Sequence, residues 1–199
     1  MDKLIVASKN KGKLAEVTAI LDGIYEVVPM AQIGMDTDIE ETGETFAENA
    51  LIKARYVYAQ TGLAALSDDS GLVVDALDGA PGVYSARYSG EHGDDAANNV
   101  LLLKNLEGKE DRTARFVSAV ALVSDKGEWV ATGSVEGVIL HEEQGNGGFG
   151  YDPLFYCTEI GKPFGLATPQ EKNAVSHRSR ALHNLVAQLK ASGKFGQGE

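Results

Sequence analysis

LIVASKNKGKLAEVTAILDGIYEVV, residues 4–28, is the stretch of sequence that decides the fold. Leu4 to Ala7 is a short apolar run with β-branched residues, which is typical of a buried strand. Polar residues 8–13 follow, and apolar side chains then recur at helical spacing from Leu14 to Leu21. Tyr25 to Val28 predicts a second strand. A strand, a helix and a strand in this order predict a β-α-β unit and therefore a parallel sheet.

Further helices and strands are predicted on both sides of the middle of the chain. Residues 45–60 are rich in Ala, Glu, Lys and Leu and predict a helix, with Thr45 and Glu48 at capping-box spacing. Residues 94–106 predict another helix. Residues 116–123 and 129–140 predict two long strands, because the Asp125-Lys126-Gly127 segment between them is typical of a hairpin turn. Part of the sheet is therefore expected to be antiparallel. The fold class predicted is α/β with a mixed sheet.

Two later segments give expectations about element boundaries. Leu63 to Leu66 and Leu72 to Val74 are short apolar runs, and the polar residues Ser67 to Gly71 between them are expected to interrupt the sheet. Thr168, Pro169 and Glu171 have the spacing of a helix start, with an N-cap, a proline in the first turn and a capping partner. One final helix is expected to follow, with an apolar face that extends to Leu189.

Length and charge restrict the kind of protein. The 199 residues suit a single compact domain, residues 1–199, with two lobes. A net charge of −11 disfavours binding to nucleic acid, and the absence of a long apolar run disfavours a membrane protein. Cys157 is the single cysteine, so no internal disulfide is possible and a reducing cytoplasm is the expected location.

A polar loop between the first strand and the first helix is a candidate phosphate site. Backbone N–H groups at a helix N-terminus and lysine ammonium groups both favour anions. A solvated turn with incidental lysines would have the same composition, and the glycine spacing of a P-loop is missing. The candidate residues are Ser8, Lys9, Asn10, Lys11, Gly12 and Lys13.

Two acidic pairs, Glu40-Glu41 and Asp68-Asp69, are candidates for binding a divalent cation. Carboxylates before a helix are often only dipole partners, and Asp-rich segments are often turns. Adjacent carboxylates repel each other unless a cation or a shared proton relieves them, and Mg²⁺ prefers carboxylate and phosphate oxygens. One member of the Asp68-Asp69 pair is therefore a candidate to hold metal and to deprotonate water.

Two predicted helices carry polar groups that suit a nucleotide. Asn49 and Lys53 are four residues apart and share a helix face, although a polar stripe on a helix is usually solvated surface. Lys172, His177 and Arg178 lie near the start of the last helix, where exposed donors could meet a purine carbonyl or a phosphate.

Residues 145–150 match G-x-G-x-x-G literally, but a dinucleotide fingerprint must open a helix, and here Tyr151-Asp152-Pro153 leads into an extended run. A Rossmann site is therefore not predicted. The alternative is a loop whose aromatic residues Phe149 and Tyr151 stack on a purine while Asp152 accepts from its N–H groups. Core aromatics in a hairpin-like loop would give the same pattern.

Taken together, these segments resemble the inosine/xanthosine triphosphate pyrophosphatase family over nearly the whole chain. The family removes non-standard purine nucleotides such as ITP, dITP and XTP. The residues that carry the resemblance form six ordered blocks: Ser8-x-Asn10-x-x-Lys13, Glu40-Glu41-Thr42-Gly43-x-Thr45-Phe46-x-x-Asn49-Ala50-x-x-Lys53-Ala54, Asp68-Asp69-Ser70-Gly71-Leu72, Pro81-Gly82-Val83-Tyr84-Ser85-Ala86-Arg87-Tyr88, Gly147-Gly148-Phe149-Gly150-Tyr151-Asp152-Pro153 and Ser176-His177-Arg178.

The resemblance implies an elongated, twisted mixed sheet with flanking helices that form two lobes around a nucleotide cleft, and a homodimer. It also implies roles for individual residues. Asp69 would be the proton acceptor and would bind Mg²⁺ with Glu40, and Lys53 would balance the charge of the triphosphate. The residues implied to contact substrate are Ser8 to Lys13, Asn49, Ser70, Phe149, Gly150, Tyr151, Asp152, Lys172, His177 and Arg178.

The expected reaction is Mg²⁺-assisted attack of water on the α-phosphorus of a purine nucleoside triphosphate, with release of pyrophosphate. Two alternatives stay open at this point. A regulatory module would bind the nucleotide without cleaving it, and a related pyrophosphatase would act on modified pyrimidine nucleotides.

Overall fold

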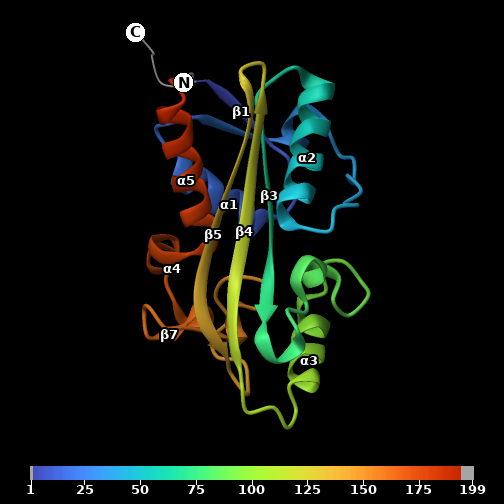
Figure 1. The fold of residues 1–199 in the computed structure, drawn as a ribbon, viewed down its shortest axis with the longest axis vertical. Helices are drawn as coiled ribbons and strands as arrows, with labels where there is room; N and C mark the ends of the chain where they lie inside the picture. The colour runs from blue at the N-terminus through green and yellow to red at the C-terminus, as the bar shows by residue number, and fades with distance from the viewer. Residues whose placement is uncertain (1, 194–199) are drawn as a thin grey trace. The chain divides into compact units, whose positions relative to one another are not determined.

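The computed structural model describes residues 2–193. A seven-stranded sheet in the order β2-β1-β3-β4-β5-β6-β7 forms its framework (Figure 1). β1 pairs in parallel with β2 and with β3, while β6 pairs antiparallel with β5 and β7, so the sheet is mixed as predicted. The strands are β1 Lys3–Val6, β2 Glu26–Pro29, β3 Ala65–Val74, β4 Thr113–Ser124, β5 Gly127–Ile139, β6 Phe155–Cys157 and β7 Lys162–Pro163.

Helices flank this sheet, and the mixed α/β class is confirmed. The α-helices are α1 Lys11–Leu21, α2 Phe46–Thr61, α3 Asp95–Asn105, α4 Pro169–Val175 and α5 His177–Ala191. Short 3₁₀ helices are η1 Met30–Ile33, η2 Asp75–Leu77, η3 Gly82–Arg87, η4 Asp152–Leu154 and η5 Phe164–Leu166. None of the helices within residues 2–193 has the length and hydropathy needed to cross a bilayer.

The chain divides into two compact units. Among the described residues, unit 1 consists of residues 2–69, 118–133 and 178–193, and unit 2 of residues 70–117 and 134–177. Each unit has its own hydrophobic core. The expectation of one domain with a cleft between two lobes stays a prediction.

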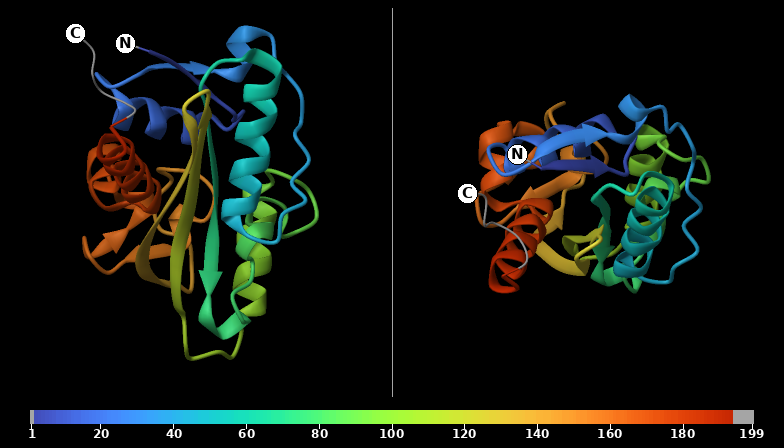
Figure 2. Two further views of the ribbon diagram at one scale, coloured as in Figure 1. Left: turned by 45° about the horizontal axis from the view of Figure 1, so that its top comes forward. Right: turned by 90° about the horizontal axis from the view of Figure 1, so that it is seen from above.

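Alternation along β4 organises the core of unit 1. Ala119, Ala121 and Val123 pack against α2, whereas Val120 and Leu122 pack in the cluster that contains the apolar face of α5. Successive strand residues point to opposite faces of a sheet, so one strand serves both helices. Figure 2 shows α2 and α5 on opposite sides of the strands of this unit.

The core of unit 2 is a single cluster built around aromatic rings. Phe116 of β4 lies 4.5 Å from Phe155 and 6.1 Å from Phe164, measured between ring centroids. Leu102 and Leu106, from α3 and the residue that follows it, pack into the same cluster. Tyr151 and Leu154 belong to the same cluster, so this core anchors the segment between β5 and β6.

The prediction that Ser67 to Gly71 interrupts the sheet is wrong. β3 is continuous from Ala65 to Val74, and Ser67, Asp68 and Asp69 are buried within it. Polar residues are unfavourable in a buried strand only when they lack partners. Here Asp68 and Asp69 find cationic partners on neighbouring elements.

Both predicted capping boxes are confirmed, at Thr45 with Glu48 before α2 and at Thr168 with Glu171 before α4. The single final helix is not. α4 ends at Val175, Ser176 has extended backbone (φ −63°, ψ 151°), and α5 begins at His177. The Ser176 residue therefore redirects the chain where sequence periodicity predicts one helix.

Candidate functional site

Asp68 of β3 is an anion held by three neighbours in unit 1. Its side chain is 3% exposed, and its Oδ2 lies 2.8 Å from the Lys13 ammonium nitrogen. Oδ1 lies 3.3 Å from Nε of Arg178 and accepts a short hydrogen bond from the Ser118 hydroxyl. Burial alone would raise the pKa of Asp68, but Arg178 and Lys13 outweigh it and hold the pKa far below its usual value. Asp68 is therefore ionised at any physiological pH.

Asp69 lies beside it in a different environment. Its side chain is 8% exposed, and its Oδ1 is 3.6 Å from the Lys53 ammonium nitrogen. Burial raises the pKa of Asp69, and the positive charges of Lys53 and Lys13 offset this only in part. Oδ2 of Asp69 is buried and has no hydrogen-bond partner among residues 2–193. The two adjacent carboxylates thus differ in chemistry, one fixed as an anion and one with raised basicity.

Lys53 links α2 to both acidic segments. Its ammonium donates to Oε1 of Glu41 at 2.9 Å and to the backbone carbonyl of Asp68 at 3.0 Å. Burial would lower the pKa of Lys53, but the carboxylates of Asp69 and Glu41 outweigh it and raise the pKa. Lys53 is thus a fixed positive charge next to Asp69.

The polar loop before α1 forms a helix N-terminus, as predicted. Asn10 is the N-cap, and its side-chain oxygen accepts from the backbone N–H of Lys13 at 3.0 Å. Ser8 accepts from the N–H of Asn10 at 3.2 Å, and Lys11 is exposed at the first position of the helix. Such a cap leaves backbone N–H groups at the start of α1 available to an anion.

Two lysines of this loop already contact carboxylates. Lys13 pairs with Asp68, whereas Lys9 pairs with Asp36 and Asp38, at 2.9 Å in each case. The Lys9 pairs are exposed, so water and salt screen them. They connect the loop to the segment that leads toward Glu41.

Asn49 points a free donor into unit 1. It is fully buried, its Oδ1 accepts from the backbone N–H of Gly43 at 2.7 Å, and its Nδ2 has no partner among the described residues. A side chain at Gly43 would not fit, because its Cβ would lie 2.6 Å from Cβ of Glu48. The glycine is therefore what allows the acidic segment to approach the helix and orient Asn49.

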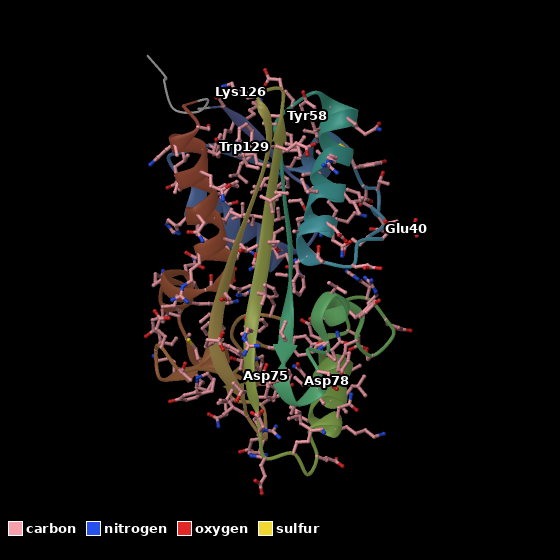
Figure 3. All side chains as sticks on the ribbon, in the orientation of Figure 1. Glu40, Tyr58, Asp75, Asp78, Lys126 and Trp129 are labelled. Atoms are coloured by element: carbon pink, nitrogen blue, oxygen red, sulfur yellow. The ribbon has the colours of Figure 1, made fainter. Side chains whose placement is uncertain are left out.

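The two glutamates before α2 lie differently. Glu41 is paired with Lys53, whereas Glu40 is exposed and lies on the loop on the side away from α2 (Figure 3). In this structure it is Glu41 that shares a cationic partner with Asp69.

A second polar cluster lies in unit 2, around the loop between β5 and β6. Asp152 is 2% exposed, and its Oδ2 accepts from the Lys172 ammonium at 2.7 Å and from the backbone N–H of Phe149 at 3.0 Å. The Lys172 nitrogen lies 4.4 Å from the centroid of the Phe149 ring. A half-buried aromatic ring, a carboxylate and a cation therefore occur together, which is a combination able to bind a flat polar heterocycle.

Close backbone packing gives the loop its shape. Gly148 has φ +71°, and a Cβ there would collide with the Asp152 carboxylate. Tyr151 points its hydroxyl into unit 2, where it donates to the carbonyl of Ser85 at 2.7 Å, and burial raises its pKa. Tyr151 thus anchors the loop.

The predicted site residues fall into these two groups. Unit 2 holds Ser70, Phe149, Gly150, Tyr151, Asp152, Lys172 and His177, and unit 1 holds Ser8 to Lys13, Glu40, Asn49, Lys53, Asp69 and Arg178. Within unit 1, Lys13, Lys53 and Arg178 all contact Asp68, and Lys53 also contacts Asp69. Lys172, Asp152 and Phe149 are in contact with one another. The boundary of the units separates His177, whose ring stacks on Phe116 at 4.9 Å, from Arg178.

Arg178 is the residue whose surroundings differ most from expectation. It is 1% exposed and forms ion pairs with Glu16 of α1 and with Asp68. Sequence reasoning did not identify Glu16 or Ser118 as members of the site. Glu16 is separated from Arg178 by 162 positions and Ser118 from Asp68 by 50, and a single sequence holds no signal for such pairings.

Known proteins resemble this chain over nearly its full length. The Ham1 family model matches residues 4–188. A protein of Geobacter sulfurreducens named dITP/XTP pyrophosphatase is 53% identical over 193 residues, which cover 95% of this chain and 97% of the relative. The solved structure of a HAM1 protein from Coxiella burnetii has a TM-score of 0.86 at 44% identity and covers 96% of this chain and 100% of that chain.

The structure of the Staphylococcus aureus Ham1 protein is similar too, with a TM-score of 0.85 at 38% identity over 96% of this chain and 99% of that chain. Sequence, fold and family model agree, and the chain belongs to the Ham1 family.

Proposed function

We propose that this protein hydrolyses the non-standard purine nucleoside triphosphates ITP, dITP and XTP to the monophosphate and pyrophosphate. Its relative from Geobacter sulfurreducens carries the name dITP/XTP pyrophosphatase at 53% identity. The observation that carries the proposal is the cluster in unit 1, where Lys13 and Lys53 flank the adjacent carboxylates of Asp68 and Asp69. Cations for a polyphosphate and a basic carboxylate are the two requirements of this reaction.

The residues of unit 1 fit a divalent cation. The buried Oδ2 of Asp69 lacks a partner within residues 2–193, and a buried carboxylate oxygen without a partner is unfavourable unless a cation or a proton binds it. Those residues contain no group of three or more His, Cys, Asp or Glu side chains able to hold a metal. Mg²⁺ does not require one, because it binds through one or two carboxylates together with substrate phosphates and waters.

We assign Asp69 as one ligand for Mg²⁺. For the second carboxylate, sequence reasoning predicts Glu40, while the contacts favour Glu41, which shares Lys53 with Asp69. When bound, Mg²⁺ would neutralise charge on the phosphates that react and leave.

Asp69 is the proposed proton acceptor. A base with a raised pKa binds a proton more strongly at neutral pH, so burial makes Asp69 a better base than an exposed aspartate. A bond forms between the water oxygen and the α-phosphorus, and the bond from that phosphorus to the oxygen bridging to the β-phosphorus breaks. One proton of the water moves to Asp69, and pyrophosphate leaves with the electron pair.

Donors around the carboxylates would hold the triphosphate. The Nδ2 of Asn49 is buried without a partner among the described residues and is suited to a phosphate oxygen. The N-terminus of α1 and the lysines of residues 8–13 add positive potential. Ser8, Lys9, Asn10, Lys11, Gly12 and Lys13 are proposed as the phosphate-binding segment.

The cluster of unit 2 is proposed to read the base. Phe149 offers a ring for stacking, Lys172 a donor for a 6-oxo group and Asp152 an acceptor for ring N–H groups. The 6-amino group of adenine is a donor and would face the Lys172 ammonium, which is also a donor, so ATP should bind poorly. Ser70, Gly150, Tyr151, His177 and Arg178 stay candidates for substrate contact, and the homodimer and the cytoplasmic location stay predictions.

A substrate panel tests the proposal. ITP, XTP, GTP and dUTP are incubated separately with protein and Mg²⁺, and pyrophosphate and orthophosphate are measured. We expect pyrophosphate from ITP and XTP at much higher kcat/KM than from dUTP, and the value for GTP, which also carries a 6-oxo group, measures how far a 2-amino group is excluded. Preference for dUTP would indicate a pyrimidine enzyme, and nucleotide binding without any product would indicate a sensor.

A further inference from the structure

The backbone of Gly150, between Phe149 and Tyr151, is held on both sides by α3. Its N–H donates to Oδ2 of Asp95 at 2.9 Å, and its carbonyl accepts from Nδ2 of Asn99 at 3.2 Å. The same Asn99 nitrogen donates to Oε1 of Glu143 at 2.9 Å, just before the glycine-rich segment begins. All these groups belong to unit 2.

We propose that Asp95 and Asn99 are positioning residues for base recognition, because they fix Gly150 and thereby the orientation of Phe149 and Asp152. This inference rests on the proposed function of the loop as the reader of the purine. Neither residue would touch the nucleotide, and neither takes part in the chemical step.

The tip of the loop needs such support. Gly148 and Gly150 have φ of +71° and +61°, and glycine in these conformations gains no rigidity from a side chain. The base of the loop is fixed separately, by bonds from Gln144 N–H to Pro153 C=O at 2.9 Å and from Gly147 N–H to Gly165 C=O at 3.0 Å. Gly150 is not part of these two bonds, and side chains of α3 bond to both its N–H and its carbonyl.

Asn99 is placed to act as a rigid clamp. It is 4% exposed, and its two donor bonds are partly shielded from water, where a lost bond costs more than at the surface. Its Oδ1 has no hydrogen-bond partner in the part of the chain that the structure describes. The role of the side chain therefore comes from its donors, which bridge the start of the loop and Gly150.

A purely structural role is the alternative to be separated. Asp95 lies in the first turn of α3, where a carboxylate stabilises the helix dipole, and Asn99 is one of the buried amides of that helix. Asp94 provides a matched control, because it caps the same helix through the N–H of Ala97 at 3.0 Å and makes no side-chain hydrogen bond to the loop within residues 2–193. Asn105, exposed on the same helix and bonded to the hydroxyl of Tyr88, is the control for Asn99.

The test compares Asp95→Ala with Asp94→Ala, and Asn99→Leu with Asn105→Leu. For ITP and ATP, kcat and KM are measured for each, and amide hydrogen exchange is followed in the peptide that covers residues 145–152. We expect Asp95→Ala and Asn99→Leu to raise KM for ITP about tenfold and to leave kcat within about twofold of the wild-type value. The ratio of kcat/KM for ITP to kcat/KM for ATP should fall in both variants. Exchange in the loop should accelerate in these two variants alone. Asp95→Asn, which retains an acceptor for Gly150, should restore most of the discrimination.

Equal effects of Asp94→Ala and Asp95→Ala, or unchanged discrimination in both loop variants, would overturn the proposal. If Asn99→Leu does not fold, the exposed Asp95 decides the question on its own. If the wild type turns over none of these nucleotides, the proposed function fails. The positioning role of Asp95 and Asn99 is then tested by comparing the dissociation constants for ITP and ATP, measured by calorimetry, and the loop exchange rates between the wild type and the two loop variants. Unchanged values in the loop variants would reject it, as would a wild type that binds neither nucleotide.

Discussion

The Lys53 ammonium nitrogen lies 3.6 Å from Oδ1 of Asp69, close enough to stabilise the carboxylate but longer than its 2.9 Å contact with Glu41. Burial raises the pKa of Asp69, and the positive charges of Lys53 and Lys13 offset this only in part. Asp68, next in the chain, has its pKa lowered by Arg178 and Lys13 against the effect of burial. This difference in pKa is the reason that Asp69 is proposed as the base and that Asp68 is assigned as a permanently ionised partner of Arg178 and Lys13.

Asp69→Asn is expected to remove the proton acceptor while it preserves size and polarity. Turnover of ITP should fall by at least about 100-fold, the lower end of what general-base catalysis contributes, while ITP binding survives. Steady-state kinetics and calorimetry measure the two effects. Asp75→Asn, on the surface of unit 2, should leave turnover unchanged. Full activity of the Asp69 variant would remove Asp69 from the mechanism.

Lys53→Met should move the acidic limb of the pH profile. The base must be deprotonated, so kcat/KM rises with pH through the pKa of Asp69. The positive charge of Lys53 lowers that pKa, and without it the limb should shift toward higher pH. Rates measured from pH 4 upward test this, with Lys190→Met on the exposed side of α5 as the matched control. A limb that shifts downward, or does not move, would show that Lys53 does not set the basicity of Asp69.

Asp68→Ala should destabilise the protein. Its loss removes one of the carboxylates that pair with the buried Arg178, and breaking a buried ion pair typically costs about 3 to 5 kcal/mol. Urea unfolding measures the change. Asp75→Ala, which breaks an exposed pair with Arg115, should cost much less.

Asp68 should also give the wild type a dependence of stability on pH. Its pKa in the folded protein lies well below that of an unperturbed aspartate, so its stabilisation is present above the unperturbed pKa and is lost as the pH falls toward the folded-state pKa. Asp68→Asn should make the free energy of unfolding depend less on pH over this acidic range. An unchanged slope would contradict the assigned ion pair.

Phe149→Leu should weaken base binding without changing the chemical step. Stacking of a base on an aromatic ring contributes about 1 to 3 kcal/mol, so KM for ITP should rise by at least about fivefold while kcat stays close to the wild-type value. Tyr84→Leu, which removes an aromatic ring that is 59% exposed in η3, is the control. A loss of kcat at unchanged KM would argue against stacking.

Much of the fold follows from local sequence signals. The capping boxes at Thr45 and Thr168 and the turn between β4 and β5 depend on residues within a few positions of each other, and sequence reasoning locates them correctly. β3 shows where this fails, because Asp68 and Asp69 are tolerated in a buried strand only through Lys13, Lys53 and Arg178, which come from distant parts of the chain.

In the candidate site too, local sequence signals are predictable and contacts between distant residues are not. Residue type and family resemblance predict Asp69, Lys53 and Asp152 as site residues, and their roles stay predictions. Glu16 could not be predicted in the same way, because its place beside the cluster depends on a contact with the remote Arg178. The support of Gly150 by α3 was missed for the same reason, since Asp95 and Asn99 have ordinary positions for a helical first turn and a buried amide.

The most direct test of the central claim is hydrolysis of ITP with Mg²⁺ in water enriched in ¹⁸O, followed by mass spectrometry of both products. Attack at the α-phosphorus predicts one ¹⁸O atom in IMP and none in pyrophosphate. Label in pyrophosphate, or release of orthophosphate in place of pyrophosphate, would contradict the proposed reaction.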